Sequence, residues 1–491
     1  MMPRLNAALL PSLPAEVQRP LYDRDALETG IVHIGLGAFH RAHQAVYTED
    51  ALNRAFGPWG ICGVSLRSPE TRDALALQDG LYTVVSRGAD GERLRVVGAV
   101  TECLVAPEAP DTVLERLARP AVRIVTITVT EKGYCHEPAT GSLDERHPDI
   151  LHDLAHPDRP RTLPGFLVEA LDRRRKAGLD PFTVLSCDNL PGNGDVVRKV
   201  LHRFAEIRDP ALARWIGERL ACPNSMVDRI VPATTPEDRS AVSRRLGVSD
   251  AWPVVTEAFS QWVVEDHFPT GRPAWEKEGV QMVRDVRPFE MMKLRLLNAS
   301  HSCIAYLGSL AGYETVARTI ADPAFAGFIR KLMDQEVTPT LDLPEGFDVA
   351  AYKDALLERF ANPALKHRTL QIAMDGSQKL PQRLLGTIAE RLQAGAPIDR
   401  LALGVAAWMR FVTGRDEQGA PIEIRDPLAG RLSAIVAETG PEPARLVPGL
   451  LEITEVFGKN LPANPAFTGT VTQALERLYA RGAQSCVEEL A

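Results

Sequence analysis

The chain has 491 residues, which exceeds the usual size of a single domain, so two domains are expected. Hydrophobic residues make up 45% of it and charged residues 24%, as in an ordinary globular protein, which excludes a largely disordered chain. The formal net charge is −8 and the lysine and arginine residues are scattered, which argues against nucleic-acid binding.

Neither export nor membrane insertion is expected. The first residues, MMPRLNAALLPSLPAEV, lack the long apolar core of a signal peptide, and no apolar run approaches the ~18 residues that span a membrane. The seven cysteines are dispersed without a C-x-x-C pair, which suits reduced thiols and argues against a disulfide framework and a zinc site. We therefore expect a cytoplasmic protein that binds no metal.

The first predicted elements form a strand–helix–strand unit over residues 30–66. An apolar strand at 31–34 leads into a glycine-containing turn, a helix at 40–56 and a second strand at 61–66. Two further runs rich in β-branched residues, at 124–129 and 182–186, are typical of strands buried on both faces of a parallel sheet. Amphipathic helices at 165–176 and 194–205 follow these strands. The pattern predicts an α/β fold with a Rossmann-type, doubly wound parallel sheet.

The pattern changes after Pro288, where helical periodicity replaces the β-branched runs and continues to the end of the chain. Turn signals interrupt this helical pattern, at the pairs Asp322-Pro323, Asn362-Pro363, Asp426-Pro427 and Gly440-Pro441. We predict a first domain over residues 1–285 and a mostly α-helical second domain over residues 286–491.

A glycine-containing turn, Gly35 to His40, follows the first strand and opens a helix. There, glycines let the backbone approach a pyrophosphate, and the helix N-terminus favours its negative charge. Gly35, Gly37, Ala38 and Phe39 are therefore candidates for binding a dinucleotide cofactor. Because His40 stands where the third glycine of G-x-G-x-x-G is expected, an ordinary glycine-rich turn stays an alternative.

Three charged residues could complete the cofactor site. Arg41, just inside the predicted helix, could pair with a phosphate oxygen or remain a solvated surface residue. At the end of the second strand, an acidic side chain would bind the ribose 2′-hydroxyl of NAD, whereas a basic one would accept the 2′-phosphate of NADP. Glu70 is the candidate for the first role and Arg67 for the second. We favour NAD and leave NADP open.

Polar residues that could carry a reaction occur in the helical stretch EMMKLRLLNASHSCIAYLG. On an α-helix Asn298 and His301 share a face, while Lys293 lies roughly 80° round from His301 and about 12 Å lower along the axis. A satisfied helix histidine and a surface lysine are the alternative. Two further polar clusters, 186–189 and 130–134, end strands of the predicted sheet, which is where ligands collect in open α/β folds.

The sequence resembles the mannitol dehydrogenase family of long-chain polyol and sugar-acid dehydrogenases over nearly its whole length. The matching segments are IVHIGLGAFHRAHQAVYTED, VTEKGYC, FTVLSCDNLPGNG, PNSMVDRIVP, SQWVVEDHF, the K-x-x-x-x-N-x-x-H run at 293–301, and QIAMDGSQKLPQR.

The resemblance implies a Rossmann-type first domain, a helical second domain, a catalytic site between them and an oxidoreductase that needs no metal. Lys293 would be the acid/base, Asn189 and Asn298 would polarise the reacting oxygen, and His301 would hold the substrate. Asp228 matches a family site residue, and Glu290 matches a carboxylate implicated in proton passage. Monomers occur in the family.

The substrate class stays open between two branches of the family. Lys132 after Glu131, and His367-Arg368 before QIAMDGSQK, resemble fructuronate reductases, and such cations suit a carboxylate. Cys135 and GVSLRS resemble mannitol 2-dehydrogenases as much. We therefore expect interconversion of D-fructuronate and D-mannonate, with mannitol or arabinitol 2-dehydrogenase as one alternative and a non-catalytic, nucleotide-bound sugar sensor as another.

Overall fold

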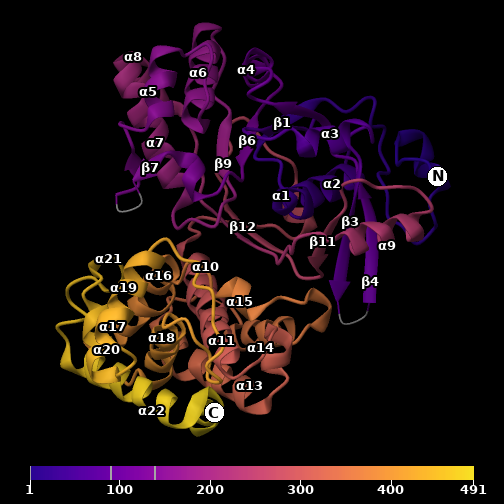
Figure 1. Cartoon of the computed structure of the whole chain (residues 1–491). Coiled ribbons are helices and arrows are strands. Elements are labelled where there is room, and N and C mark those ends of the chain that lie inside the picture. The colour runs from indigo at the N-terminus through magenta and orange to yellow at the C-terminus, as the bar shows by residue number, and fades with distance from the viewer. Residues whose placement is uncertain (1, 89–90, 138–139, 345) are drawn as a thin grey trace. The chain divides into compact units, whose positions relative to one another are not determined.

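The computed structural model describes residues 2–88, 91–137, 140–344 and 346–491. The chain divides into two compact units, Met1–Arg287 and Pro288–Ala491. Unit 1 is built around a parallel sheet and unit 2 is mostly helical, so the predicted fold class is confirmed (Figure 1).

The main sheet of unit 1 has five strands in the order β5-β2-β1-β6-β9, and every neighbouring pair is parallel. Its strands are β1 (Thr29–Ile34), β2 (Gly60–Ser65), β5 (Val100–Val105), β6 (Ile124–Ile127) and β9 (Thr183–Ser186). The chain adds strands on one side of β1 and then returns to add β6 on the other. Because the direction of winding reverses there, a crevice for ligands is expected at the carboxyl ends of β1 and β6.

Hydrophobic side chains cover both faces of this sheet, as the β-branched runs predict. In β1, Val32 and Ile34 enter one core cluster, whereas Ile31 enters the other, because alternate residues of a strand face opposite sides. The first cluster includes Phe166, from one of the helices that cover that face, and the second includes Trp262. Burial on both sides explains why these strands lack the polar alternation of a half-exposed sheet.

The remaining elements of unit 1 are smaller sheets and helices. The smaller sheets have the orders β10-β12-β13, β11-β3-β4 and β7-β8. Their strands are β3 (Tyr82–Gly88), β4 (Gly91–Val97), β7 (His136–Glu137), β8 (Ser142–Leu143), β10 (Ser225–Asp228), β11 (Val254–Glu257), β12 (Gln261–Glu265) and β13 (Gln281–Val283). The helices are η1 (Ala7–Ser12), α1 (Ala38–Ala42), α2 (Gln44–Arg54), α3 (Glu70–Ala76), α4 (Pro110–Ala118), η2 (Glu131–Tyr134), α5 (Pro148–Ala155), α6 (Leu163–Lys176), α7 (Asn193–Arg208), α8 (Pro210–Arg219), α9 (Pro236–Leu246) and η3 (Trp275–Glu278).

The single helix predicted at residues 40–56 is in fact two helices, α1 and α2. The break falls at His43, whose backbone leaves the helical region with φ −125° and ψ −89°. The imidazole of His43 contacts the carbonyl of Gln261 in β12 through Nε2, at 2.9 Å. This long-range contact has no counterpart in the local sequence pattern.

Unit 2 contains helices throughout, and two of the four pairs noted in the sequence, Asp322-Pro323 and Asn362-Pro363, start helices. Asp322 and Asn362 accept hydrogen bonds from the backbone N–H groups of Ala324 and Ala364, with proline as the first helical residue in each case. The helices are α10 (Arg287–Met292), η4 (Lys293–Asn298), α11 (Ala299–Leu310), α12 (Val316–Ile320), α13 (Pro323–Lys331), η5 (Leu332–Val337), η6 (Thr338–Thr340), α14 (Val349–Phe360), η7 (Pro363–Leu365), α15 (Thr369–Ile372), α16 (Gly376–Leu380), η8 (Pro381–Leu385), α17 (Gly386–Gln393), α18 (Asp399–Phe411), α19 (Ala429–Thr439), α20 (Pro443–Leu451), α21 (Thr454–Phe457) and α22 (Pro465–Leu490).

We predict that Gly35→Ala destabilises unit 1 by on the order of 3 kcal/mol, because Gly35 has φ +99° and an added Cβ would lie 2.0 Å from the carbonyl oxygen of Thr128. Gly37→Ala is the matched control, since its Cβ would meet only the Gly35 carbonyl at 3.7 Å. Urea unfolding of both variants measures the difference. Equal stability of the two proteins would contradict the prediction.

Candidate active site

The glycine turn after β1 is held by hydrogen bonds to a single carbonyl group. The carbonyl oxygen of Gly35 accepts from the amide of Gly37 at 2.6 Å and from the hydroxyl of Thr128 at 2.8 Å. Thr128 follows β6, the neighbouring strand. The turn is therefore fixed at the point where the sheet reverses its winding.

His40 replaces the third glycine of the nucleotide motif without opening a gap between helix and strand. Its ring stacks on that of His33 in β1, with centroids 3.4 Å apart and planes at 10°. His33 in turn contacts the hydroxyl of Thr126 at 2.8 Å and the carbonyl of Gly35 at 3.1 Å. The third glycine of the motif serves close packing of helix on strand. Here two flat rings perform that packing, so the departure from the motif is compensated.

A cavity of about 1460 Å³ lies against this turn. Among the predicted residues, Gly35, Gly37, Arg67 and Lys132 line it. Gly35 is needed for the turn itself, because an added Cβ would lie 2.0 Å from the Thr128 carbonyl oxygen. A glycine turn of this kind at a helix start lets the backbone approach a pyrophosphate. The residues present therefore fit a dinucleotide: the turn would hold its phosphates, and the residues after β2 would meet its ribose.

The structure places the other predicted cofactor residues elsewhere. Arg41 is buried; it donates to the carbonyl of Trp252 and its guanidinium lies over the ring of Tyr82. Glu70 is the exposed first residue of α3, and neither it nor Arg41 is among the described residues that line the cavity. Ala38 and Phe39 begin α1 and are half-buried. The phosphate contact predicted for Arg41 does not fit this position.

Asp188 joins the two strand-end clusters that the sequence analysis singled out. Its carboxylate accepts from the amides of Val129 and Thr130 at 3.0 and 2.9 Å and from the hydroxyl of Tyr134 at 2.6 Å. Thr130 has φ +65°, a strained value for a residue with a branched side chain. Burial raises the pKa of the Asp188 carboxyl group. Asn189, the next residue, is exposed beyond the end of β9.

Asp228 is the last residue of β10 and is buried, with Gln261 of β12 opposite it in the antiparallel register. Of the residues of unit 1 predicted to act on the substrate, Asn189 and Asp228 therefore lie at strand ends, and Lys132 lies in the short helix η2 after β6.

In unit 2, Lys293, Asn298 and His301 lie on one continuous helical segment and all three are buried. The α-helical geometry predicted from the sequence for this segment is wrong. Residues Lys293–Asn298 form a π-helical turn. A π-helix takes more residues per turn than the 3.6 of an α-helix. The rotation about the helix axis between Lys293 and His301 is therefore smaller than the predicted angle of roughly 80°, and the two residues come closer to one face. Such turns occur frequently at functional sites.

Basic groups and rings surround the imidazole of His301. Its ring lies 4.7 Å from that of Phe360 and 5.6 Å from that of His367, measured between centroids. Burial lowers the pKa of His301 well below its usual value, and the nearby His367, Arg383, Arg359 and Lys293 lower it further. The ring is therefore neutral at pH 7. Among the described residues no group hydrogen-bonds to its Nε2 atom, which leaves this buried nitrogen available to a ligand.

Two arginines that sequence reasoning missed secure the π-helical turn. Arg383 donates to the carbonyl of Asn298 at 3.2 Å and to the hydroxyl of Ser302 at 3.1 Å. Arg295 forms a two-pronged ion pair with Glu390. Burial lowers the pKa of Arg383 to about 10, which leaves it charged at neutral pH. Arg383 ends the QIAMDGSQKLPQR segment, so the resemblance pointed to its position without assigning it a role.

Lys379, in the same segment, was missed too. Its amine donates to the carbonyls of Ile372 and Met374, and burial lowers its pKa to about 8, with Arg383 contributing. Glu290 lies in α10, three residues before Lys293, and is half-buried.

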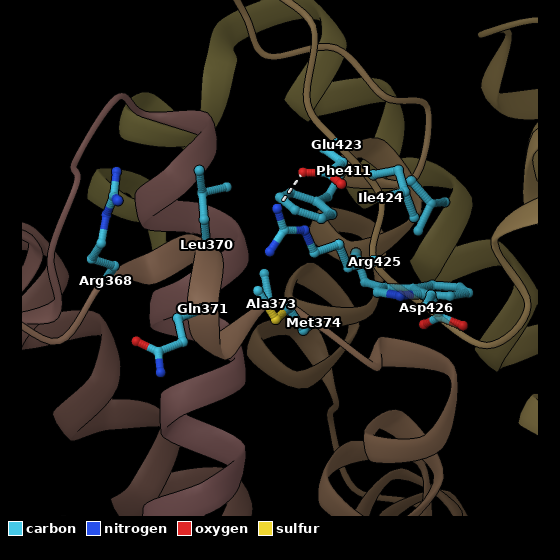
Figure 2. Close-up of a pocket in the computed structure, with 12 residues that line it drawn as sticks. Arg368, Leu370, Gln371, Ala373, Met374, Phe411, Glu423, Ile424, Arg425 and Asp426 are labelled. Atoms are coloured by element: carbon cyan, nitrogen blue, oxygen red, sulfur yellow. Dashed lines mark hydrogen bonds and ion pairs between the residues drawn. The ribbon is translucent and has the colours of Figure 1, made fainter. Parts of the chain in front are cut away.

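Arg368 lies beside this cluster but faces a separate cavity of about 320 Å³ in unit 2. Figure 2 shows Arg368 on one wall of that cavity and the Arg425–Glu423 ion pair on the other. None of Lys293, Asn298 and His301 is among the described residues that line it. The residue before it, His367, contacts the ring of His301. We therefore place the candidate chemistry at the buried cluster and treat the cavity as its neighbour.

Neither a metal-binding cluster nor a membrane-spanning helix occurs among the described residues. No group of three His, Cys, Asp or Glu side chains is arranged to hold a metal ion there. No helix within the described ranges is both long and apolar enough to cross a bilayer. All seven cysteines are free thiols.

A parallel sheet with a glycine turn over a large cavity, and a helical unit with a buried lysine, asparagine and histidine, define a two-unit dehydrogenase. Two family models match the chain: the mannitol dehydrogenase Rossmann domain over residues 29–277 and the mannitol dehydrogenase C-terminal domain over residues 285–479. The chain belongs to the mannitol dehydrogenase family of oxidoreductases, and the resemblance seen in the sequence is confirmed.

Individual relatives are similar over nearly the full length. The uncharacterized oxidoreductase YeiQ of Escherichia coli K12 is 50% identical over 487 residues, which covers 98% of this chain and 99% of that protein. The D-mannonate oxidoreductase of the same organism is 49% identical over 479 residues, or 96% and 98% of the two chains. The ternary complex of Pseudomonas fluorescens mannitol 2-dehydrogenase with NAD and D-mannitol matches with a TM-score of 0.89 at 42% identity, covering 99% of both chains.

We predict that the free energy of unfolding decreases as the pH falls below about 6.5, because the unfolded chain then binds protons that neutral, buried His301 and His367 do not. The pKa values of both histidines are lowered in the folded chain. The stability that the two neutral side chains contribute is therefore fully present above pH 6.5 and decreases as the pH falls toward their folded pKa values. His301→Asn should reduce the slope by up to about 1.4 kcal/mol per pH unit.

Urea unfolding between pH 5 and 8 measures this slope, and His202→Asn, at an exposed position in α7, is the control. A slope unchanged by His301→Asn would show that the imidazole does titrate in the folded protein.

Proposed function

We propose that this protein is an NAD-dependent oxidoreductase that interconverts a ketose sugar acid and the corresponding polyol acid, D-fructuronate and D-mannonate, with Lys293 as the acid/base. The observation that carries the proposal is the buried cluster of basic groups around His301, on the same helical segment as Lys293. Support for NAD comes from the glycine turn over its cavity and from the NAD bound in the P. fluorescens relative.

Bound NAD(H) would accept or supply the hydride at the substrate carbon. The substrate oxygen must then lose or gain a proton in step, and Lys293 is the group proposed to exchange it. The amide of Asn298 would donate a hydrogen bond to the same oxygen, a contact of the oxyanion-hole type typically worth about 3 kcal/mol. Neutral His301 has an available Nε2 with which to hold a substrate hydroxyl. The corresponding roles of Asn189, Asp228, Glu290 and Lys132 stay predictions from the resemblance.

A carboxylate-bearing substrate suits the charges of unit 2. Basic side chains crowd together around His301, and a half-buried anion requires such charged partners. Arg368 adds a further cation. It is exposed, no carboxylate among the described residues forms an ion pair with it, and it directly follows His367. Here its side chain faces the neighbouring cavity, so a contact with an anion held beside His301 would require this long, flexible side chain to take another rotamer.

A second candidate, oxidation of D-mannitol to D-fructose, is favoured by the relative with bound D-mannitol, which shares 42% of its sequence with this chain. The comparisons lend no support to a non-catalytic sensor.

We predict that Lys293→Ala lowers kcat by about 10²- to 10⁴-fold, because general acid/base catalysis contributes that much. The Kd of NADH, measured by its fluorescence, should stay within about threefold of the wild-type value, since the proposed cofactor turn lies in unit 1. Lys459→Ala, at an exposed lysine of unit 2, is the control. Full turnover by Lys293→Ala would remove the assigned acid/base.

We predict that Arg368→Ala lowers kcat/KM for D-fructuronate by about 10- to 100-fold with NADH, the range expected for the loss of a charged hydrogen bond, and leaves D-fructose nearly unaffected. Arg425→Ala is a matched control, because Arg425 faces the same cavity but pairs with Glu423 at 2.6 Å. Wild-type preference for D-fructose over D-fructuronate would favour the mannitol 2-dehydrogenase alternative. An equal loss on both substrates would argue against a carboxylate contact.

A further inference from the structure

The corner of the unit 1 cavity after β2 carries an arginine where a carboxylate would select NAD. Strand β2 ends at Ser65, and Arg67, Ser68 and Thr71 all line the cavity beyond it. In this fold the residues at the end of the second strand meet the 2′ position of the adenine ribose. The acidic residue that the sequence offered for that role, Glu70, is exposed and is not among the described residues lining the cavity.

The charge of Arg67 is available to a ligand. It is exposed, and within the described part of the chain no carboxylate forms an ion pair with it. Glu108, a carboxylate of the cavity wall, is instead paired with Arg72 at 2.9 Å, and Arg72 also binds Asp73 at 2.6 Å. Two further carboxylates line the cavity, Asp111 in the first turn of α4 and Asp149 in the first turn of α5.

Hydroxyl groups beside Arg67 complete an arrangement suited to a phosphate. The Oγ atom of Ser68 accepts from the amide of Glu70 at 3.4 Å, so its own proton is left to donate to an anion. Thr71, in the first turn of α3, offers a second hydroxyl donor. A guanidinium can bind two phosphate oxygens at once, and hydroxyls can satisfy the remainder.

We propose that Arg67, Ser68 and Thr71 form a subsite for the 2′-phosphate of NADP(H), so that the protein binds NADP(H) as well as NAD(H). The proposal rests on the proposed function only in that the cavity takes a nicotinamide dinucleotide. It is independent of the sugar substrate and of Lys293.

The test measures the Kd of NADPH and of NADH on the full-length protein by the fluorescence of the reduced nicotinamide. For the wild type we expect the two values to lie within about tenfold of each other. Arg67→Glu should weaken NADPH at least about tenfold more than NADH, because it replaces the cation by a group that repels phosphate and accepts from a 2′-hydroxyl. Glu70→Gln is the control and should leave the ratio of the two Kd values within about threefold of wild type.

Equal weakening of both cofactors by Arg67→Glu would place Arg67 on a phosphate that both share and would overturn the proposal. So would wild-type binding of NADPH more than about 100-fold weaker than that of NADH. Arg67→Gln serves as a second variant should Arg67→Glu fold poorly, with the same direction of effect expected. Since binding is measured without turnover, failure to reduce any sugar would count against the proposed function and leave this result intact.

Discussion

The crowding of basic groups in the buried part of unit 2 is the constraint on which the proposed chemistry depends. Burial disfavours a positive charge on His301 and on His367, and the nearby His367, Arg383, Arg359 and Lys293 disfavour it further on His301. The histidines respond by staying neutral. Arg383 stays charged because even a lowered pKa of about 10 lies well above neutral pH. An arrangement of this kind is most stable when it faces an anion or an oxygen that gains negative charge, which is what a sugar acid and a developing alkoxide provide.

The π-helical turn makes this cluster possible. A strictly α-helical segment would rotate Lys293 away from Asn298 and His301, and its carbonyls would all be satisfied within the helix. The wider turn brings the three side chains toward one face and changes the backbone pairing around Asn298. Arg383 donates to the Asn298 carbonyl from η8, and Arg295 anchors the same turn to Glu390 in α17. These two arginines act through the backbone, so their part is to position the groups that would touch a substrate.

In unit 1, contacts between distant segments fix the backbone around the candidate cofactor cavity. The turn after β1 requires a glycine at position 35, because the Thr128 carbonyl occupies the space of a side chain. The third glycine of the motif is dispensable here, since the His33–His40 stack fills the gap between strand and helix. Asp188 holds the strained backbone at Thr130 in the same crevice. The cavity wall is thus defined by contacts between the ends of β1, β6 and β9, which lie far apart in the sequence.

The sequence by itself determined the parallel sheet, the glycine turn, the helical character of the second unit and the family. Local periodicity, β-branched composition or ordered motifs predict each of these features, and all three depend on neighbours along the chain. Tertiary structure alone decided that Arg41 is buried against the ring of Tyr82 and that Arg67 rather than Glu70 faces the cavity. It also decided that His367 contacts His301 while Arg368 faces the neighbouring cavity. It also decided that Lys293–Asn298 form a π-helical turn. The direction of a side chain and the width of a helical turn depend on the energy of packing against distant segments. A pattern of neighbouring residues does not predict that energy.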